Sequence, residues 1–202
     1  MLLALFNLLK KFLSLLFIGI VIKLMDDYLD EDKDNLTNSK NLSHLLKKGI
    51  LPYSLLLFAI AVIADFNYSI SIFMSSYITG MLYNVDEKSN LGITFRAEII
   101  VVLLIGIFMF GVKEMSSSIF LIASVQLLDD YIDYEKDKPF KKGFAWKIGK
   151  AECLMVFILC VLISLYLDYL KTFFSYICLS IILFFVRNYD FSNNDFISNK
   201  EG

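Results

Sequence analysis

The sequence has few of the residues from which soluble metal and redox sites are usually built. Its 202 residues include one histidine, His44, and three cysteines, Cys153, Cys160 and Cys178. The cysteines lie in apolar runs and share no ligand spacing with the histidine, so we expect buried free thiols rather than a disulfide or a zinc site. The net charge of −2 gives no reason to expect a nucleic-acid partner.

The N-terminus also lacks the features of a cleaved signal peptide. The stretch Met1–Met25 is apolar, but it has no early basic segment and no small-residue cleavage site. It runs directly into an acidic stretch. We therefore expect it to remain in the mature protein.

Hydrophobic residues make up 57% of the chain, which is far more than an ordinary soluble domain contains. Long apolar runs separated by polar segments predict an all-α, polytopic transmembrane bundle of about seven helices. The predicted spans are 12–28, 49–65, 67–84, 97–112, 115 into the stretch 127–137, 151–168 and 171–187. The apolar segment Met1–Asn7 either lies at the membrane interface or lengthens the first helix. We expect one transmembrane domain over residues 1–187 and a polar cytoplasmic tail over 188–202.

One stretch of eleven residues occurs twice, each time at the end of a long apolar run. The copies, 24–34 and 127–137, are 103 residues apart and share a Leu, an Asp pair, a Tyr, a third Asp, a Lys and a last Asp. Residues four apart on a helix lie on one face, so each copy predicts a row of three carboxylates. The rows are Asp26, Asp30 and Asp34 in the first copy, and Asp129, Asp133 and Asp137 in the second.

Six carboxylates in two rows repel one another unless a cation lies among them. Mg²⁺ prefers oxygen ligands and commonly shares them with phosphate, so the six row aspartates are predicted to bind Mg²⁺ together with a diphosphate. The alternative is a pair of solvated acidic helix ends. Loop lysines are candidates for holding the phosphates, although each alone also fits a topology signal. They are Lys40, Lys47, Lys136, Lys141 and Lys142.

A polyprenyl diphosphate combines such a head group with a tail that lies between membrane helices. Loss of its diphosphate leaves an allylic cation, which the faces of aromatic rings can stabilise. Tyr28 and Tyr131 directly follow the two Asp pairs and are candidates for this role. The predicted catalytic residues are Asp27, Asp30, Tyr28, Asp130 and Tyr131.

Charge placement predicts the orientation in the membrane. If the seven helices alternate in direction, all but five of the 19 Lys and Arg residues lie on the side of the two acidic stretches. The positive-inside rule places that side in the cytoplasm. We expect the membrane to be a bacterial cell membrane. The opposite loops hold only Lys113 and Lys171. The remaining exceptions are Lys10, Lys11 and Lys23.

The paired acidic stretches resemble the motifs of the UbiA superfamily of intramembrane prenyltransferases. That family carries (N/D)DxxDxxxD on one helix and DxxxDxxxD on another, and both patterns occur here, beginning at Asp26 and at Asp129. The resemblance implies that Asp26, Asp30, Asp129 and Asp133 approach Mg²⁺, with Asp34 and Asp137 in a layer nearer the loops. Asp27 and Asp130 lie about 100° round the helix from the rows, which suits supporting positions.

The resemblance implies an enzyme that moves a prenyl group from a polyprenyl diphosphate to an aromatic or other lipophilic acceptor. The alternative is a non-catalytic membrane protein that binds a polyprenyl (di)phosphate or a protein partner. A CDP-alcohol phosphotransferase would need Asp-Gly and Ala-Arg pairs around its aspartates, which the two copies lack. A soluble prenyl synthase is excluded by the hydrophobic content. Pairing of the chain with itself to cover exposed helix faces remains open.

Overall fold

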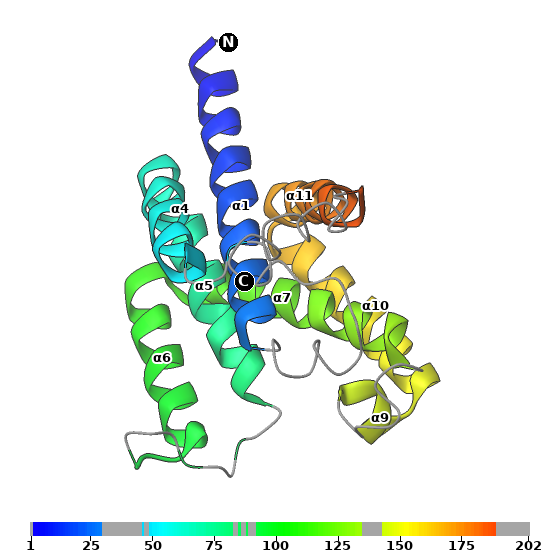
Figure 1. Ribbon diagram of the computed structural model, residues 1–202. Coiled ribbons are helices and arrows are strands. Elements are labelled where there is room, and N and C mark those ends of the chain that lie inside the picture. Colours follow the sequence, from blue (N-terminus) through cyan, green and yellow to red (C-terminus); the bar gives the residue numbers. More distant parts are fainter. Residues whose placement is uncertain are drawn as a thin grey trace, which may run out of the picture. The chain divides into compact units, whose positions relative to one another are not determined.

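A computed structural model of the 202-residue chain shows a helical protein (Figure 1). The structure describes residues 2–29, 46, 49–82, 85, 88, 92–134 and 143–188. Within these residues the chain forms eight helices and no β-strand. The prediction of an all-α fold is therefore confirmed.

Seven of the eight helices coincide with the seven predicted apolar segments. They are α1 (Leu2–Leu29), α4 (Ile50–Ala64), α5 (Phe66–Met81), α6 (Phe95–Phe110), α7 (Val112–Ile132), α10 (Lys150–Leu167) and α11 (Tyr169–Asn188). The apolar N-terminal segment lengthens α1, which was one of the two predicted alternatives. The prediction was wrong for α9 (Phe144–Ile148), which lies in a segment expected to be a basic loop. Five helical residues between Gly143 and Gly149 are too few to give a periodic hydrophobic pattern.

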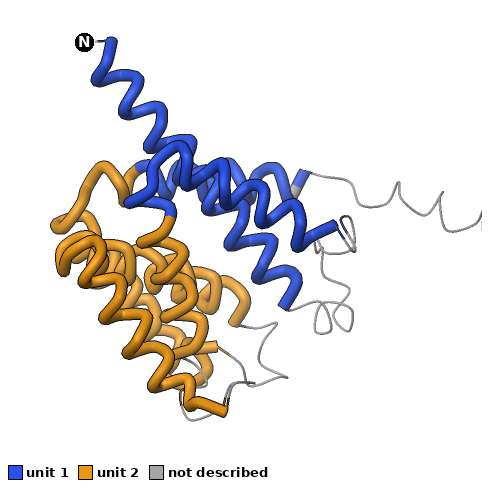
Figure 2. The backbone as a smooth tube through the Cα atoms, turned by 90° about the vertical axis from the view of Figure 1, so that its left-hand side faces the viewer, with its two compact units in different colours: residues 1–69, 174–202 blue, residues 70–173 orange. Residues whose placement is uncertain are grey.

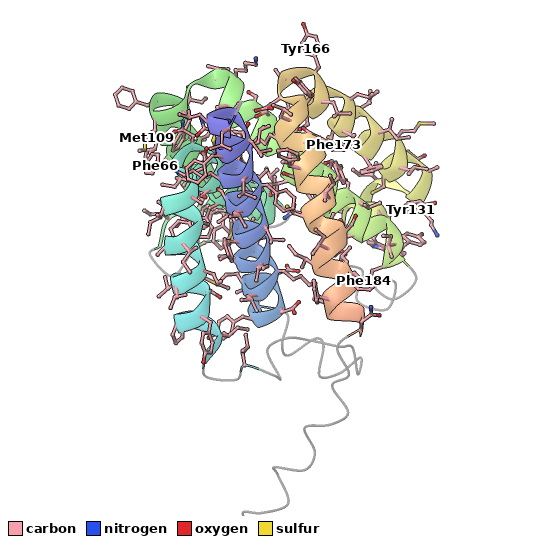
Figure 3. The ribbon with its side chains drawn as sticks, turned by 90° about the horizontal axis from the view of Figure 1, so that it is seen from above. Phe66, Met109, Tyr131, Tyr166, Phe173 and Phe184 are labelled. Carbon is pink, nitrogen blue, oxygen red and sulfur yellow. The ribbon has the colours of Figure 1, made fainter. Side chains whose placement is uncertain are left out.

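Three described helices, α1, α10 and α11, are long and apolar enough to cross a membrane. Helices α4, α5 and α6 have 15 or 16 residues. At 1.5 Å per residue they extend about 22–24 Å, which is less than the roughly 30 Å of a hydrocarbon core. Large apolar side chains are exposed on α4, α6, α10 and α11. Among them, Met109 of α6 and Tyr166 of α10 point away from the chain (Figure 3). An apolar exterior of this kind suits lipid.

The chain divides into two compact units, coloured separately in Figure 2. Unit 1 comprises residues 1–69 and 174–202, and unit 2 comprises residues 70–173. Each unit carries one copy of the acidic stretch. The expectation of one transmembrane domain over 1–187 stays a prediction, and residues 189–202 of the expected tail lie outside the described residues.

In unit 1, α1 packs along α4 through a buried face that includes Leu15, Ile18 and Val21. Polar contacts fix α1 at the turn between α4 and α5. The Ser14 hydroxyl donates to the backbone oxygen of Asp65 at 3.2 Å and lies 2.6 Å from the Ser69 hydroxyl. Leu2–Lys10 precede this level of α1 and are exposed on every side of the helix.

In unit 2, α6 and α7 form a hairpin that reverses at Gly111, whose φ of 85° suits glycine. The two helices approach closely at Gly106, where an added Cβ would lie 2.7 Å from the Met115 sulfur. Helix α10 packs along α7, and α9 packs against both. The acidic end of α7 and the first turn of α10 therefore lie at the same end of unit 2.

The buried face of α1 gives a test of the packing in unit 1. Replacing Ile18, which is 1% exposed, by Ala should lower the free energy of unfolding by about 2–5 kcal/mol, because it leaves a cavity. Replacing Leu9, which is 52% exposed on the same helix, by Ala should change it by about 0.5 kcal/mol or less. Unfolding of the purified protein in detergent, followed by circular dichroism, measures both. Equal losses in the two variants would contradict the described packing of α1.

Candidate functional site

The described part of each copy, 24–29 or 127–134, lies at the C-terminal end of a long helix as the structure describes it. As described, α1 reaches Leu29 and α7 reaches Ile132, which are equivalent positions of the two copies. The backbone N–H of Asp133 donates to the oxygen of Asp129 at 2.9 Å, so helical spacing continues to Asp133. Asp129 and Asp133 are thus one turn apart, the spacing on which the predicted carboxylate row depends.

Carboxylates at this end of a helix are electrostatically unfavourable. The C-terminus carries the negative end of the helix dipole, which opposes each nearby negative charge by about 0.3–1 kcal/mol. The last turns of α1 and α7 contain two aspartates each and no basic residue. The same unfavourable placement therefore occurs twice, and a bound cation would relieve it in both helices.

In the first copy, the two aspartates of the pair have different surroundings. The Asp26 side chain is 58% exposed, whereas that of Asp27 is 5% exposed. Lys23, one turn earlier on α1, places its ammonium 2.8 Å from Asp27 Oδ1 and 3.6 Å from Asp26 Oδ2. Lys23 therefore lies closest to the buried Asp27, while Asp26 is also within ion-pair distance of Lys23 but is exposed.

The second copy repeats this difference with another partner. Asp129 is exposed, and the half-buried Asp130 accepts a hydrogen bond from the backbone N–H of Phe144 at 2.6 Å. Phe144 is the first residue of α9. Gly143 before it has a φ of 90°, and a Cβ there would lie 3.0 Å from Asp130 Oδ1. Asp130 is therefore in close contact with the backbone of α9.

Aromatic rings surround a cation at the second copy. The Lys150 ammonium lies 5.3 Å from the centroid of the Tyr131 ring and 5.4 Å from that of Tyr134. Both distances suit cation–π attraction. Tyr131, a predicted aromatic stabiliser of an allylic cation, thus already faces a positive charge. Its counterpart Tyr28 is 42% exposed at the end of α1.

Several predicted site residues lie outside the described residues. They are Asp30, Asp34, Lys40, Lys47, Lys136, Asp137, Lys141 and Lys142. Among the residues that the structure describes, no three potential metal ligands gather in one place. The described members of the two rows are Asp26 in unit 1 and Asp129 and Asp133 in unit 2. The roles predicted for all of these residues stay predictions.

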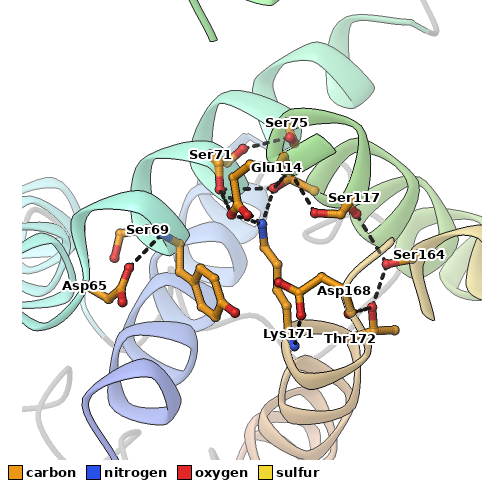
Figure 4. Close-up of polar contacts among 12 residues, drawn as sticks. Asp65, Ser69, Ser71, Ser75, Glu114, Ser117, Ser164, Asp168, Lys171 and Thr172 are labelled. Atoms are coloured by element: carbon orange, nitrogen blue, oxygen red, sulfur yellow. Dashed lines mark hydrogen bonds and ion pairs between the residues drawn. The ribbon is translucent and has the colours of Figure 1, made fainter. Parts of the chain in front are cut away.

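A buried ion pair lies at the other end of α7, and the sequence interpretation missed it (Figure 4). Lys171 was expected in a loop, but it lies in the first turn of α11 and is fully buried. Its ammonium is 2.5 Å from Glu114 Oε1 and 3.2 Å from the Ser71 hydroxyl, and it also donates to Ser118. The N–H of Lys171 donates to Asp168 Oδ1 at 3.0 Å. Asp168 directly before the helix is the sequence signal for a helix start, because its carboxylate accepts a backbone N–H of the first turn.

Hydroxyl groups extend the polar contacts around this ion pair. Ser71 donates to Glu114 Oε1 at 3.2 Å. Ser164 lies 2.7 Å from the Thr172 hydroxyl and donates to the backbone oxygen of Ser117 at 3.3 Å. All three ammonium protons of Lys171 thus have acceptors, so the cluster joins α5, α7 and α11 without leaving a reactive group.

Comparisons with protein-family models, with curated proteins and with solved structures gave no match. Function must therefore be inferred from the acidic stretches and their surroundings. The ion pair between Glu114 and Lys171, at the other end of unit 2, is a structural contact between α7 and α11.

The two partners of the buried ion pair should respond differently to neutralisation. The Glu114→Gln change leaves the Lys171 ammonium, 1% exposed, without its countercharge and should cost about 3–5 kcal/mol of unfolding free energy. The Lys171→Met change should cost less, because the remaining Glu114 carboxylate is 22% exposed. Chemical unfolding of the detergent-solubilised variants measures the difference.

Two further variants control this comparison. The double variant Glu114→Gln/Lys171→Met should regain most of the loss, since no buried charge remains. Lys113→Met removes an exposed cation next to Glu114 and should change stability by about 0.5 kcal/mol or less. A Glu114→Gln variant as stable as Lys113→Met would show that the ion pair is not formed.

Proposed function

We propose that the protein is a membrane-embedded, Mg²⁺-dependent prenyltransferase of the kind that the UbiA superfamily represents. Its substrate would be a polyprenyl diphosphate and its acceptor an aromatic or other lipophilic molecule. The observation that carries the proposal is the placement of the same acidic stretch at the ends of two long helices, α1 and α7. In both copies the first aspartate of the pair, Asp26 or Asp129, is exposed.

The donor chemistry of these residues fits Mg²⁺. Carboxylate oxygens are the ligands that this ion prefers, and Asp129 and Asp133 present two of them one turn apart. The C-terminal position of the carboxylates makes a nearby cation favourable in both helices. When bound, Mg²⁺ would neutralise the charge that develops on the departing diphosphate.

The aromatic residues next to the aspartates fit the organic part of the substrate. Tyr28 and Tyr131 directly follow the Asp pairs, and the Tyr131 ring already attracts the Lys150 ammonium. A ring that binds one cation can also stabilise an allylic cation placed over its face. The prenyl tail would lie among the apolar side chains of helices that cross the bilayer.

The proposed orientation has the acidic ends of α1 and α7 on the cytoplasmic side. The structure changes one part of the charge count behind it. Because the Lys171 charge is buried against Glu114, it does not act as a loop charge on the opposite side. The opposite loops then retain Lys113, while Lys10 and Lys11 remain exceptions in α1. This strengthens the asymmetry on which the positive-inside rule relies.

A second candidate function is binding of a polyprenyl (di)phosphate without chemistry. The contacts of the second copy favour it in one respect, because Lys150 occupies the Tyr131 face that a reactive allylic cation would need. Binding alone requires the exposed carboxylates and a cation, but it needs no open aromatic face. Release of inorganic diphosphate from a bound prenyl diphosphate separates the two functions, since only the enzyme produces it.

The acidic rows are tested by neutral substitutions. Asp30→Asn and Asp133→Asn should each lower Mg²⁺-dependent binding of a long prenyl diphosphate by at least about 100-fold, because each removes a metal ligand. Calorimetric titration of the purified protein in detergent, with Mg²⁺ and with a chelator, measures this loss. Membrane insertion should be unchanged.

Matched controls come from two carboxylates outside the rows, at the starts of α5 and α11. Asp65 accepts a hydrogen bond from the N–H of Tyr68, and Asp168 accepts one from that of Lys171, each at 3.0 Å. Asp65→Asn and Asp168→Asn should leave binding unchanged. Full binding by both row variants would refute the assignment of the rows.

The proposed orientation is tested by a reporter. A reporter enzyme or fluorescent protein fused after Gly202 should be active on the cytoplasmic side, since six of the seven spans follow the first acidic stretch and an even number of crossings returns the chain to the same side. Fusions after residues 65 and 111 should report the opposite side. A Gly202 fusion that reports the outer side would contradict seven spans.

A further inference from the structure

We infer that Asp130 is a positioning residue: it fastens α9 to the end of α7 and thereby holds Lys150 over Tyr131 and Tyr134. Its role in the proposed prenyltransfer, which this inference refines, would then be to arrange the second acidic copy rather than to bind Mg²⁺. The geometry that supports the fastening is independent of any bound ligand.

The contact between Asp130 and α9 is short and specific. Oδ2 accepts the N–H of Phe144 at 2.6 Å, and a carboxylate acceptor makes this hydrogen bond stronger than a neutral one. Oδ1 would lie 3.0 Å from a Cβ on Gly143, so any larger residue there would displace the carboxylate by a few tenths of an ångström. The φ of 90° at Gly143 independently favours glycine.

Helix α9 depends on such contacts because it is too short to be stable alone. Five residues form little more than one turn, and isolated helices of this length do not persist in water. Apolar packing provides a second attachment: Ala145 is 2% exposed and belongs to one buried cluster with Leu127, Cys153 and Cys160. Removing the Asp130 hydrogen bond should therefore loosen α9 without unfolding the rest of unit 2.

Helix α9 and helix α10, which begins at Lys150, both pack against α7. Gly149 alone separates the end of α9 from Lys150, the first residue of α10. In the described part of the chain no carboxylate forms an ion pair with Lys150, and its ammonium faces the two tyrosine rings. Tyr131 directly follows Asp130 on α7. Asp130, which accepts the N–H of α9, thus lies beside the contact of Lys150 with the two tyrosine rings and beside the exposed Asp129.

The first copy supports the same division of roles. Asp27, the equivalent of Asp130, is held by Lys23 at 2.8 Å. The residue equivalent to Lys23 in the second copy is Gln126, which has no charge to offer. In both copies the second aspartate is the more buried of the pair and has a short contact with a positive or N–H partner, while the first aspartate is exposed. The second aspartates therefore have structural partners of their own.

Amide hydrogen exchange of the full chain in detergent, without ligand, tests the fastening directly. Asp130→Ala should speed exchange of the segment 143–148 by about tenfold or more, the effect expected for loss of a hydrogen bond to a charged group. Asp130→Asn retains an acceptor oxygen and should show an intermediate rate. Gly143→Ala should release α9 from the opposite side of the contact.

The chain offers a control and a second signal. Asp168→Ala removes a carboxylate that accepts the N–H of Lys171, and it should leave exchange at 143–148 unchanged. The single tryptophan, Trp146, lies in α9 and is 39% exposed, so its emission should shift with Asp130→Ala and not with Asp168→Ala. Unchanged exchange and emission in Asp130→Ala and Gly143→Ala would overturn the inference.

Binding of inorganic pyrophosphate with Mg²⁺ distinguishes positioning from metal ligation. A positioning role predicts that Asp130→Asn binds within about threefold of the wild type while Asp130→Ala binds at least about tenfold more weakly. Equal, complete loss in both variants with α9 still protected in Asp130→Asn would identify Asp130 as a metal ligand. If the wild type itself binds no pyrophosphate, the proposed function fails, and the exchange data alone decide the fastening of α9.

Discussion

The unfavourable placement of negative charge at two helix ends is the constraint on which the proposed function depends. Asp26 and Asp27 end α1, and Asp129 and Asp130 end α7, where the helix dipole opposes them and no basic residue occupies the last turn. The protein relieves this repulsion only in part, through Lys23 and the N–H of Phe144. Asp26 and Asp129 are the more exposed member of each pair, so a cation from outside the chain could reach both, and this is the physical argument for the proposed Mg²⁺–diphosphate site.

The two ends of unit 2 differ in how their charged side chains are compensated. At the end away from the acidic copy, Lys171 and Glu114 neutralise each other within a set of hydroxyl groups that satisfies every ammonium proton. At the acidic end, the Asp130 hydrogen bond and the apolar packing of Ala145 hold α9, while Asp129 is exposed. The buried ion pair joins helices at one end of unit 2, and the carboxylates of the proposed site lie at the other.

The helices could be predicted because long apolar runs separated by polar segments are a strong signal, and all seven predicted segments are helical. The paired acidic stretches could also be recognised, because the same aspartates recur with identical spacing in two stretches that are 103 residues apart. Helix α9 could not be predicted, since it depends on the Asp130 contact and on two glycines rather than on its own five residues. The burial of Lys171 was also missed, because its partners Glu114 and Ser71 are far from it in sequence and meet it only in the fold.

The most direct test of the central claim is a titration with Mn²⁺, which stands in for Mg²⁺ and is visible by electron paramagnetic resonance. The account predicts that detergent-purified, folded protein binds Mn²⁺ saturably when inorganic pyrophosphate is present, and that Asp26→Asn and Asp129→Asn together eliminate this binding while Asp65→Asn and Asp168→Asn together preserve it. A spectrum of free Mn²⁺ alone in the folded wild-type protein would contradict it, because the two acidic helix ends would then hold no cation.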